Sequence, residues 1–500
     1  MTKPNLARRE FIKNSAIVAS VAAVPTCLTA GCTKEKKHFP EGKLNVAVVG
    51  LGMGYHNMLN CVDENIVAFC DVDEMRIKGR LKHFKEKFPN KVEPYLYQDY
   101  REMFSEVGDQ IDAVIIATPD HTHAKITLEA MKLGKHVYCQ KPLTHSVYES
   151  RILTQAAKKY NVVTQMGNQG ASSGSTAWVC ESIWNGDIGE VKEVHAWTNR
   201  PIWPQCLNRP EETPPIPKEI DWDLWLGPAK ERPYHPSYHP WNWRGWWDFG
   251  TGALGDMACH IFDVIMRSLR LQYPSGIQAS CTKWNIESPP EAEKIIYYFP
   301  ERKAYKKIGM PEVKITWYDG GLLPERPAEL EDGEMMGDRD GGVLFVGTKG
   351  KIVCGCYAKN PRLLPTKKFK DYKPEINERL IPGGIGGHEK DWVKACKAKP
   401  EDREILKSNF EYAGPFNEVV VMGTVASRLA GLNRILKWDG PNMKFTNISK
   451  EEKIKIPEYV KLDTSGSFPR YVSKHVPVNA LEYAESLIKR NARKGWELKL

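Results

Sequence analysis

The sequence predicts an α/β protein with two main domains, and three features lead to this prediction. A short apolar strand at 44–49 runs directly into a glycine-rich turn at 50–54. Strand and helix patterns then alternate up to residue 160, an order that builds a parallel sheet. Beyond residue 160, several segments alternate apolar and polar residues, as half-buried strands do.

The glycine turn and the strand after it form a candidate dinucleotide site. The turn reads Gly50-Leu51-Gly52-Met53-Gly54, and its glycines would let the backbone approach a pyrophosphate at the start of the next helix. Tyr55 stands where the G-x-G-x-x-G pattern has its third glycine. The next strand, 66–70, ends at Asp71, where an acid can hydrogen-bond the ribose of NAD and repel the extra phosphate of NADP. The sequence therefore predicts an N-terminal Rossmann dinucleotide-binding domain at 44–160 that binds NAD rather than NADP.

The other elements of this domain follow in order along the chain. We expect a helix at 72–88, strands at 95–97 and 111–118, a helix at 124–133 and a strand at 136–139. Open α/β sheets bind ligands at the carboxyl ends of their strands. Two loops at such ends carry polar side chains: Thr118-Pro119-Asp120-His121-Thr122-His123 and Gln140-Lys141-Pro142.

A second candidate site lies at 234–263, where an aromatic loop leads into a helix. On that helix Asp256 and His260 are four residues apart, so they share a face. Flat rings followed by an Asp/His pair are typical of a sugar-sized pocket with a proton-transfer group. A tryptophan-rich core segment with a hydrogen-bonded histidine would show the same pattern, and this stretch alone does not decide between them.

Taken together, these motifs resemble the Gfo/Idh/MocA oxidoreductases, relatives of glucose–fructose oxidoreductase and inositol dehydrogenase. The resemblance rests on the glycine turn, Asp71, the 118–123 loop and Gln140-Lys141-Pro142, where the family usually has Glu-Lys-Pro. It continues through 165–169, 234–263 and 408–413, and covers about 44–440.

The resemblance implies a second, α+β domain at 161–450, built on a large, mostly antiparallel open sheet. Strand patterns agree with it at 191–198, 277–284, 295–299, 313–318 and 343–346. We also expect loops at 201–240, 319–342 and 358–387, an amphipathic helix at 417–436, and a charged C-terminal extension at 451–500 with a weak helix at 479–491.

The resemblance also implies roles for individual residues. Lys141 would be a catalytic lysine, His260 the general base, and Asp256 would orient the substrate or stabilise a charged imidazole. The expected cofactor contacts are Gly50, Leu51, Gly52, Met53, Gly54, Asp71, Thr118, Pro119, Asp120, His123, Gln140, Lys141 and Asn168. The expected substrate contacts are Gln169, Arg200, Trp203, Tyr238, Arg244, Trp246, Asp256 and His260, although some of the aromatic residues must serve only as packing. Asp256 and His260 lack an evident third ligand, so no metal site is predicted.

The N-terminus resembles a targeting signal. Residues 8–13, Arg8-Arg9-Glu10-Phe11-Ile12-Lys13, resemble a twin-arginine export signal, and the apolar run after them is too short to span a bilayer. Residues 28–32 resemble a lipobox, whose cleavage would leave an acylated Cys32; an ordinary cleaved signal is the other interpretation. We therefore expect a signal at 1–32, a linker at 33–43 and export to the periplasm, either with or without a lipid anchor.

Charge and cysteine content narrow the class of protein further. The formal charge of +9 is mild for 500 residues, and there is no long basic block, so we expect no nucleic-acid partner. The twelve cysteines show no CxxC pair and no zinc spacing. The open sheet of the family often pairs, so we expect a homo-oligomer.

The sequence thus predicts an NAD-dependent oxidoreductase that acts on a hydroxyl of a sugar or glycoside, with a tightly bound nicotinamide as hydride acceptor. One alternative is an NAD-dependent glycosidase that oxidises its substrate transiently, eliminates the aglycone and recycles the cofactor. Another is a non-catalytic carbohydrate-binding protein on a dehydrogenase fold.

Overall fold

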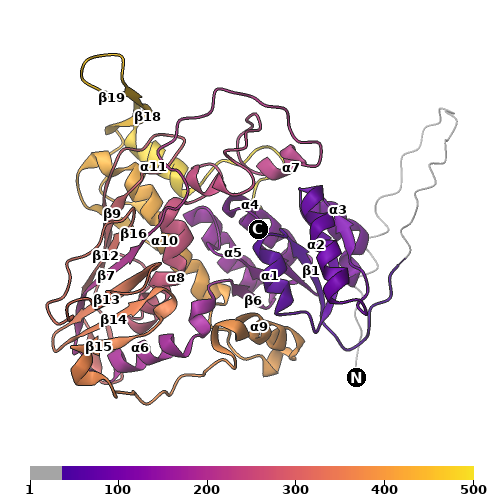
Figure 1. The fold of residues 1–500 in the computed structure, drawn as a ribbon, viewed down its shortest axis with the longest axis horizontal. Coiled ribbons are helices and arrows are strands. Elements are labelled where there is room, and N and C mark those ends of the chain that lie inside the picture. Colours follow the sequence, from indigo (N-terminus) through magenta and orange to yellow (C-terminus); the bar gives the residue numbers. More distant parts are fainter. Residues whose placement is uncertain (1–35) are drawn as a thin grey trace, which may run out of the picture. The chain divides into compact units, whose positions relative to one another are not determined.

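The computed structural model describes residues 36–500, and residues 39–500 form one unit that contains two sheet-based domains (Figure 1). The predicted signal, with Arg8, Arg9 and Cys32, lies outside the described residues. No helix in the described part of the chain is both long enough and apolar enough to cross a membrane.

The first domain is a six-stranded parallel sheet in the order β3-β2-β1-β4-β5-β6. Its strands are buried on both faces, which explains their continuous apolar runs. The strands are β1 (Asn45–Val49), β2 (Asn65–Cys70), β3 (Tyr95–Tyr97), β4 (Ala113–Ile116), β5 (His136–Cys139) and β6 (Thr164–Met166). The helices are α1 (Met53–Leu59), α2 (Glu74–Lys87), α3 (Tyr100–Val107), α4 (Asp120–Lys132) and α5 (Val147–Tyr160). The sheet therefore continues past residue 160 to Met166.

The predicted loop at 118–123 is wrong in its second half. Helix α4 begins at Asp120, four residues before its predicted start, so Asp120–His123 form its first turn. Pro119 stands at the N-cap position, and an acid in the first turn is favourable beside the positive end of the helix dipole. The polar side chains after β4 are therefore fixed by a helix rather than carried on a loop.

The second domain is a nine-stranded sheet in the order β15-β14-β13-β7-β12-β9-β8-β16-β17. Only β7 and β12 pair in parallel, so the predicted fold class, a Rossmann-type sheet followed by a mostly antiparallel open sheet, is confirmed. The strands are β7 (Val191–Thr198), β8 (Gly276–Cys281), β9 (Glu293–Phe299), β12 (Val313–Tyr318), β13 (Gly341–Gly347), β14 (Lys351–Gly355), β15 (Arg362–Leu364), β16 (Leu436–Asp439) and β17 (Lys444–Phe445). A separate hairpin joins β10 (Arg302–Tyr305) and β11 (Ile308–Met310).

Helices connect the two sheets. Helix α8 (Gly252–Ser268) and helix α10 (Phe410–Arg428) pack on the second sheet, and α10 also packs on α5 (Figure 1). Helix α6 (Gly174–Trp184) packs on α8, and helix α9 (His388–Lys397) covers the first sheet through Trp392. The predicted helix at 417–436 is wrong at both ends, because the helix begins seven residues earlier at Phe410, after its cap Asn409, and the chain turns at 430–433 into β16.

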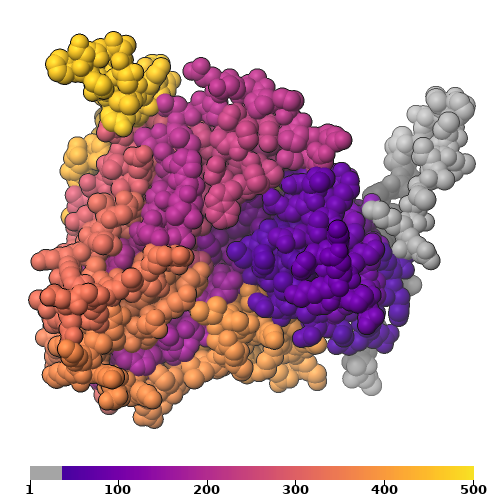
Figure 2. Space-filling model, viewed as in Figure 1, coloured from indigo at the N-terminus to yellow at the C-terminus, as the bar shows by residue number. Residues whose placement is uncertain are grey.

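Two segments that follow the first domain in the sequence contact it, the excursion and the end of the C-terminal extension. The excursion (residues 201–250) is irregular apart from α7 (Trp222–Leu226) and short turns, and it borders the indigo first domain in Figure 2. Its backbone bonds to the chain after β2, since the N–H of Glu74 donates to the oxygen of Glu219 and that of Asp221 to the oxygen of Val72.

The C-terminal extension contains a hairpin that the sequence did not predict, β18 (Lys453–Asp463) with β19 (Arg470–Asn479). The predicted weak helix is present as α11 (Ala480–Ile488). The last part of the chain, the C-terminal segment (residues 489–500), then runs to the first domain, where the carbonyl oxygen of Glu497 accepts a hydrogen bond from Lys125 of α4.

Candidate active site

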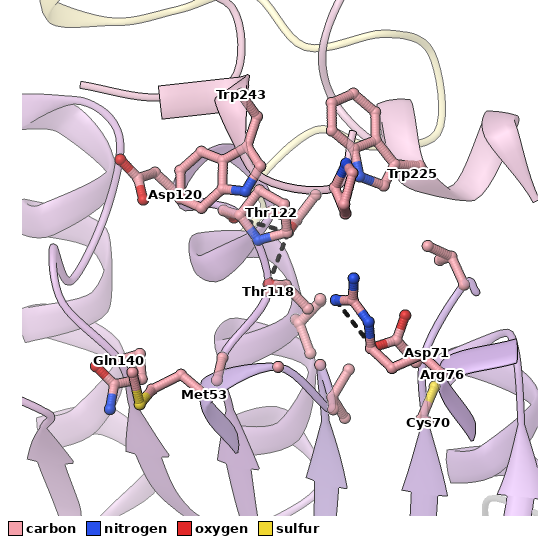
Figure 3. Close-up of a pocket in the computed structure, with 18 of the residues that line it drawn as sticks. Met53, Cys70, Asp71, Arg76, Thr118, Asp120, Thr122, Gln140, Trp225 and Trp243 are labelled. Atoms are coloured by element: carbon pink, nitrogen blue, oxygen red, sulfur yellow. Dashed lines mark hydrogen bonds and ion pairs between the residues drawn. The ribbon is translucent and has the colours of Figure 1, made fainter. Parts of the chain in front are cut away.

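A cavity of about 490 Å³ lies at the carboxyl ends of the parallel strands (Figure 3). Its floor comes from the first domain and includes Gly50, Gly52, Met53, Asp71, Thr118, Pro119, Asp120, Gln140 and Lys141. Its roof comes from the excursion, where Figure 3 shows Trp225 and Trp243 across the space from Asp71 and Met53. The cavity lies within the roughly 300–1,000 Å³ that ligand sites occupy.

The glycine turn is shaped for close approach. Gly50 has φ +89°, and a Cβ there would lie 2.5 Å from the carbonyl oxygen of Ala117, so only glycine fits. Gly52 precedes α1 without any side-chain cap, and both Gly52 and Met53 line the cavity. Leu51 and Gly54 do not line it: Leu51 is buried in the core, and Gly54 packs against Val48 and Ala117. The tight backbone packing at Gly50 and Gly54 and the uncapped start of α1 make a turn that a pyrophosphate fits.

Asp71 lies at the end of β2, where the sequence placed it. Its carboxylate accepts hydrogen bonds from the N–H groups of Leu51 and Asp73. Burial raises the pKa of Asp71. The guanidinium of Arg76, 3.8 Å away, and the two N–H groups oppose this rise. The sequence analysis missed Arg76, which also lines the cavity (Figure 3). An acid at this point selects a free ribose, whereas an arginine can pair with a 2′-phosphate, so the two side chains have opposing effects on cofactor choice.

Lys141 joins the two domains. Its Nζ donates to Oδ1 of Asp256 at 2.8 Å and to the backbone oxygen of Asp256 at 2.7 Å, and both side chains are 15% exposed. Nε of Arg244 lies 3.3 Å from the same carboxylate oxygen. Burial alone would raise the pKa of Asp256, but these two cations outweigh it and hold the pKa below its usual value. Asp256 is therefore a carboxylate that orients a lysine at the cofactor edge of the second domain.

Tryptophans of the aromatic loop position Arg244. Its guanidinium lies 4.2 Å from the ring centre of Trp241 and 4.1 Å from that of Trp243. Trp241 is 51% exposed at the cavity and keeps part of its ring open to a ligand. Cation–π contacts with these two rings hold the guanidinium of Arg244. Arg244 in turn links the roof of the cavity to Asp256.

His260 lies one turn beyond Asp256 on α8 but does not line the cavity. It is buried, and its Nδ1 has no hydrogen-bond partner in the described part of the chain. Burial lowers the pKa of His260 well below its usual value, and the positive charges of Lys141 and Arg200 lower it further. The imidazole is therefore neutral near neutral pH, which is the form that can accept a proton.

The ring of Tyr357 covers His260, with its centre 4.4 Å from that of the imidazole. Tyr357 and the next residue, Ala358, have φ of 60° and 56°, left-handed values that are strained for residues other than glycine. Gly170 makes room for this ring, because a Cβ there would lie 3.1 Å from it. The sequence analysis missed Tyr357, since a left-handed turn built without glycine leaves no signal in the sequence.

Asp120 faces the cavity from the first turn of α4. Its Oδ2 accepts a hydrogen bond from the hydroxyl of Thr251 at 2.7 Å, immediately before α8. Burial raises the pKa of Asp120 to about 7, against the lowering effects of the Thr251 hydroxyl, Arg244 and Lys141. Thr118 lines the cavity beside it and accepts a hydrogen bond from the hydroxyl of Thr122 (Figure 3).

Three aromatic candidates do not reach the cavity. The ring centres of Tyr238 and Trp246 lie 4.8 Å apart. Both rings belong to a buried cluster with Trp222, Trp225 and Phe249. Trp203 is buried and donates its indole N–H to Gln205. Their apolar surfaces are covered by other side chains, so they support the roof from behind.

Polar candidates outside the cavity have protein partners. His123 bonds to the oxygens of Pro142 and Thr118 and ties the two strand-end segments together. Asn168 donates to Asp263, Gln169 donates to Tyr138 and Glu389, and Arg200 pairs with Asp340. His388 is buried at the start of α9 and bonded to Ser172 and Met166. Among residues 36–500, no group of three or more His, Cys, Asp or Glu side chains could hold a metal ion.

Two family models match the chain. Residues 44–168 match a model described as an oxidoreductase family with an NAD-binding Rossmann fold. Residues 191–298 match a model described as the C-terminal α/β domain of an oxidoreductase family. The first domain is therefore an NAD-binding Rossmann domain, as the sequence analysis expected.

Curated relatives match over part of their length. Levoglucosan dehydrogenase of Pseudarthrobacter phenanthrenivorans is 28% identical over 38% of this chain and 40% of that protein. scyllo-Inositol 2-dehydrogenase (NAD(+)) of Bacillus subtilis is 30% identical over 35% of this chain and 47% of that protein. The chain thus matches less than half the length of these two relatives.

Solved structures share the fold over a longer span. A levoglucosan dehydrogenase in complex with NADH and levoglucosan superposes with a TM-score of 0.52 at 18% identity, over 79% of this chain and 99% of that one. The WlbA dehydrogenase of Bordetella pertussis, in complex with NADH and UDP-GlcNAcA, superposes with the same TM-score and coverage at 14% identity. At these identities the likeness concerns the fold alone.

Proposed function

The chain belongs to the Gfo/Idh/MocA oxidoreductase family, and from that premise we propose that it is an NAD-dependent oxidoreductase acting on a hydroxyl of a sugar or glycoside. The observation that carries the proposal is the contact of Lys141 with Asp256. It places an ammonium group from the end of β5 in the same cavity as the glycine turn, held by a helix of the second domain.

The residues of the cavity suit the oxidation of an alcohol. NAD, held by the glycine turn and Asp71, would supply the hydride acceptor. Lys141 would donate a hydrogen bond to the substrate oxygen and stabilise the negative charge that develops there. His260 lies behind the cavity wall, one turn beyond Asp256; its imidazole is neutral near neutral pH and is the candidate acceptor of the hydroxyl proton. Asp256 keeps the ammonium group of Lys141 in place.

A carbohydrate substrate is supported by two features. Trp241 offers an exposed flat ring at the cavity, and such rings cover the apolar faces of pyranoses. The similar proteins named above are dehydrogenases of levoglucosan and inositol. No specific observation favours the redox glycosidase or the binding-only alternative.

The experiment measures NADH absorbance and aglycone release together, with a panel of free sugars, inositols and chromogenic glycosides. We expect NADH to accumulate in proportion to the oxidised sugar. The Lys141→Ala variant should bind NAD and produce NADH far more slowly, while Lys192→Ala, at an exposed position of β7, should behave as the wild type. Aglycone release without net NADH would instead identify the glycosidase, and sugar binding without any turnover would identify the binding protein.

We also propose export by the twin-arginine route, on the strength of Arg8-Arg9 and the residues that follow. Fractionation of cells that express the wild type or an Arg8→Lys/Arg9→Lys variant tests it: only the wild type should reach the periplasm. Mass spectrometry of the exported protein would show whether Cys32 carries a lipid.

A further inference from the structure

The C-terminal segment (residues 489–500) contributes a wall to the cofactor cavity. Trp496, four residues from the end of the chain, lines the cavity together with Asp71, Gln98 and Tyr100. Both family models end well before it, at residues 168 and 298. This wall is therefore a feature of this chain beyond the part that defines the family.

Trp496 lies at the adenosine end of the cavity. The acid after the second strand of a Rossmann domain binds the ribose next to the adenine, and here that acid is Asp71. The ring of Trp496 lies 6.4 Å from that of Tyr100, at the start of α3, and 5.2 Å from the guanidinium of Arg101. A flat indole at this point can pack against a purine.

The indole of Trp496 is buried, yet its N–H has no hydrogen-bond partner among residues 36–500. The side chain is 6% exposed, and Nε1 forms no hydrogen bond with the described residues. Nε1 keeps some exposed surface, so it is not enclosed in the core. Trp496 thus lines the cavity and has an indole N–H that no residue in the described part of the chain occupies.

Contacts on both sides of Trp496 hold the segment in place. Arg493 donates to the oxygen of Gly227 at 2.8 Å and to the carboxylate of Asp223 at 2.6 Å, both at α7 of the excursion. The N–H of Arg493 donates to the oxygen of Pro228, and Lys125 of α4 donates to the oxygen of Glu497 at 3.1 Å. The segment therefore spans from the excursion to the first domain, directly across the adenosine end.

We propose that Trp496 is a cofactor-binding residue, and that the C-terminal segment retains the dinucleotide by closing the adenosine end of its site. The proposal rests on the proposed function only in requiring that NAD occupies the cavity. Because Arg493 and Lys125 hold the segment from opposite sides, the dinucleotide leaves when these contacts open. Packing of the dinucleotide against Trp496 determines the affinity for NAD. The contacts of Arg493 determine how fast the dinucleotide dissociates.

The test compares four variants of the full-length protein. NAD affinity and the NADH dissociation rate are measured for Trp496→Ala, Trp496→Phe, Arg493→Ala and Lys494→Ala; Lys494 is exposed, forms no contact with the cavity, and serves as the matched control. Base–aromatic stacking changes affinity by about 10- to 100-fold. We expect a loss of that size in Trp496→Ala, a smaller loss in Trp496→Phe, and faster dissociation in Arg493→Ala. Lys494→Ala should match the wild type.

Thermal unfolding in the absence of NAD shows whether each variant folds, and a chain ending at Ile488 gives a second measurement. That shortened chain should lose NAD during gel filtration while the wild type keeps it. Wild-type affinity and dissociation in both Trp496→Ala and the shortened chain would overturn the proposal and leave the proposed function intact. A wild-type protein that binds no NAD would overturn both.

Discussion

The floor and the roof of the cavity are built in different ways. The floor consists of short segments that each follow a parallel strand directly, at Gly50, Asp71, Thr118 and Lys141. The roof comes from two distant parts of the chain, the excursion at Trp225 and 239–244, and the C-terminal segment at Trp496. Backbone sterics and strand order fix the floor, whereas aromatic packing and ion pairs hold the roof. We therefore expect the chemistry to depend on the floor and the affinity and selectivity to depend on the roof.

The largest effect should be a loss of kcat that distinguishes Lys141 from Arg244, the two cations that contact Asp256. Lys141 approaches it from the floor and Arg244 from the roof. Removal of one donor to a developing oxyanion costs about 100- to 1,000-fold in kcat. We expect that loss in Lys141→Ala, and a rise in sugar KM with a much smaller change in kcat in Arg244→Ala. Equal losses of kcat in the two variants would contradict the expectation that the chemistry depends on the floor and the affinity on the roof.

The next largest effect concerns cofactor choice at the floor. Asp71→Ala removes the acceptor for the ribose hydroxyls and leaves Arg76 with Asp73 as its remaining acidic neighbour, so it should favour NADP over NAD relative to the wild type. Hydrogen bonds to a charged group are worth about 1.5–3 kcal/mol, which predicts a change of roughly 10- to 100-fold in the ratio of kcat/KM values. The double variant Asp71→Ala/Arg76→Ala is the control and should lose the gain for NADP. Unchanged discrimination in Asp71→Ala would refute the ribose role.

The floor could be predicted from the sequence because its signals are local. Asp71 and Lys141 each follow an apolar strand, and the position after such a strand is a ligand site in this type of sheet. Arg76 was missed because it lies inside α2, where an arginine usually indicates only a solvated face. The loop expected at Asp120 became a helical turn, since a proline can end a loop as well as precede a helix.

Of the roof, the sequence indicated only the aromatic loop and Arg244, because most of the contacts that build the roof join residues far apart in the sequence. Trp225, Trp243 and Trp246 look alike in the sequence, and only packing decides that the first two line the cavity and the third does not. Trp496 lies in the charged extension at 451–500, which gave no indication of a ligand. The β18 strand had a local signal, the alternation Lys453-Ile454-Lys455-Ile456, which the charge of the extension obscured.

A smaller effect should come from the ring that covers His260. Tyr357→Ala exposes the imidazole to water, so the pKa of His260 should rise toward about 6.5. A group with that pKa is only about one-quarter neutral at pH 6, so kcat/KM should be roughly fourfold lower at pH 6 than at pH 8. Tyr357→Phe keeps the ring and should keep the wild-type profile in this range. An acid limb that does not move in Tyr357→Ala would show that the ring does not control this protonation.

The smallest effect should come from Asp120, which links the floor to α8 through Thr251. Its pKa of about 7 means that the carboxyl group is neutral below pH 7 and negative above it. A negative charge beside the nicotinamide site stabilises the positively charged ring of NAD⁺ over NADH. The affinity ratio should therefore shift toward NAD⁺ as pH rises from 6 to 8, by about 0.7 kcal/mol or roughly threefold for unit charges about 6 Å apart in a water-like dielectric. Calorimetric titrations at several pH values measure this ratio, and Asp120→Asn should flatten it; the same slope in both proteins would assign the titration to another group.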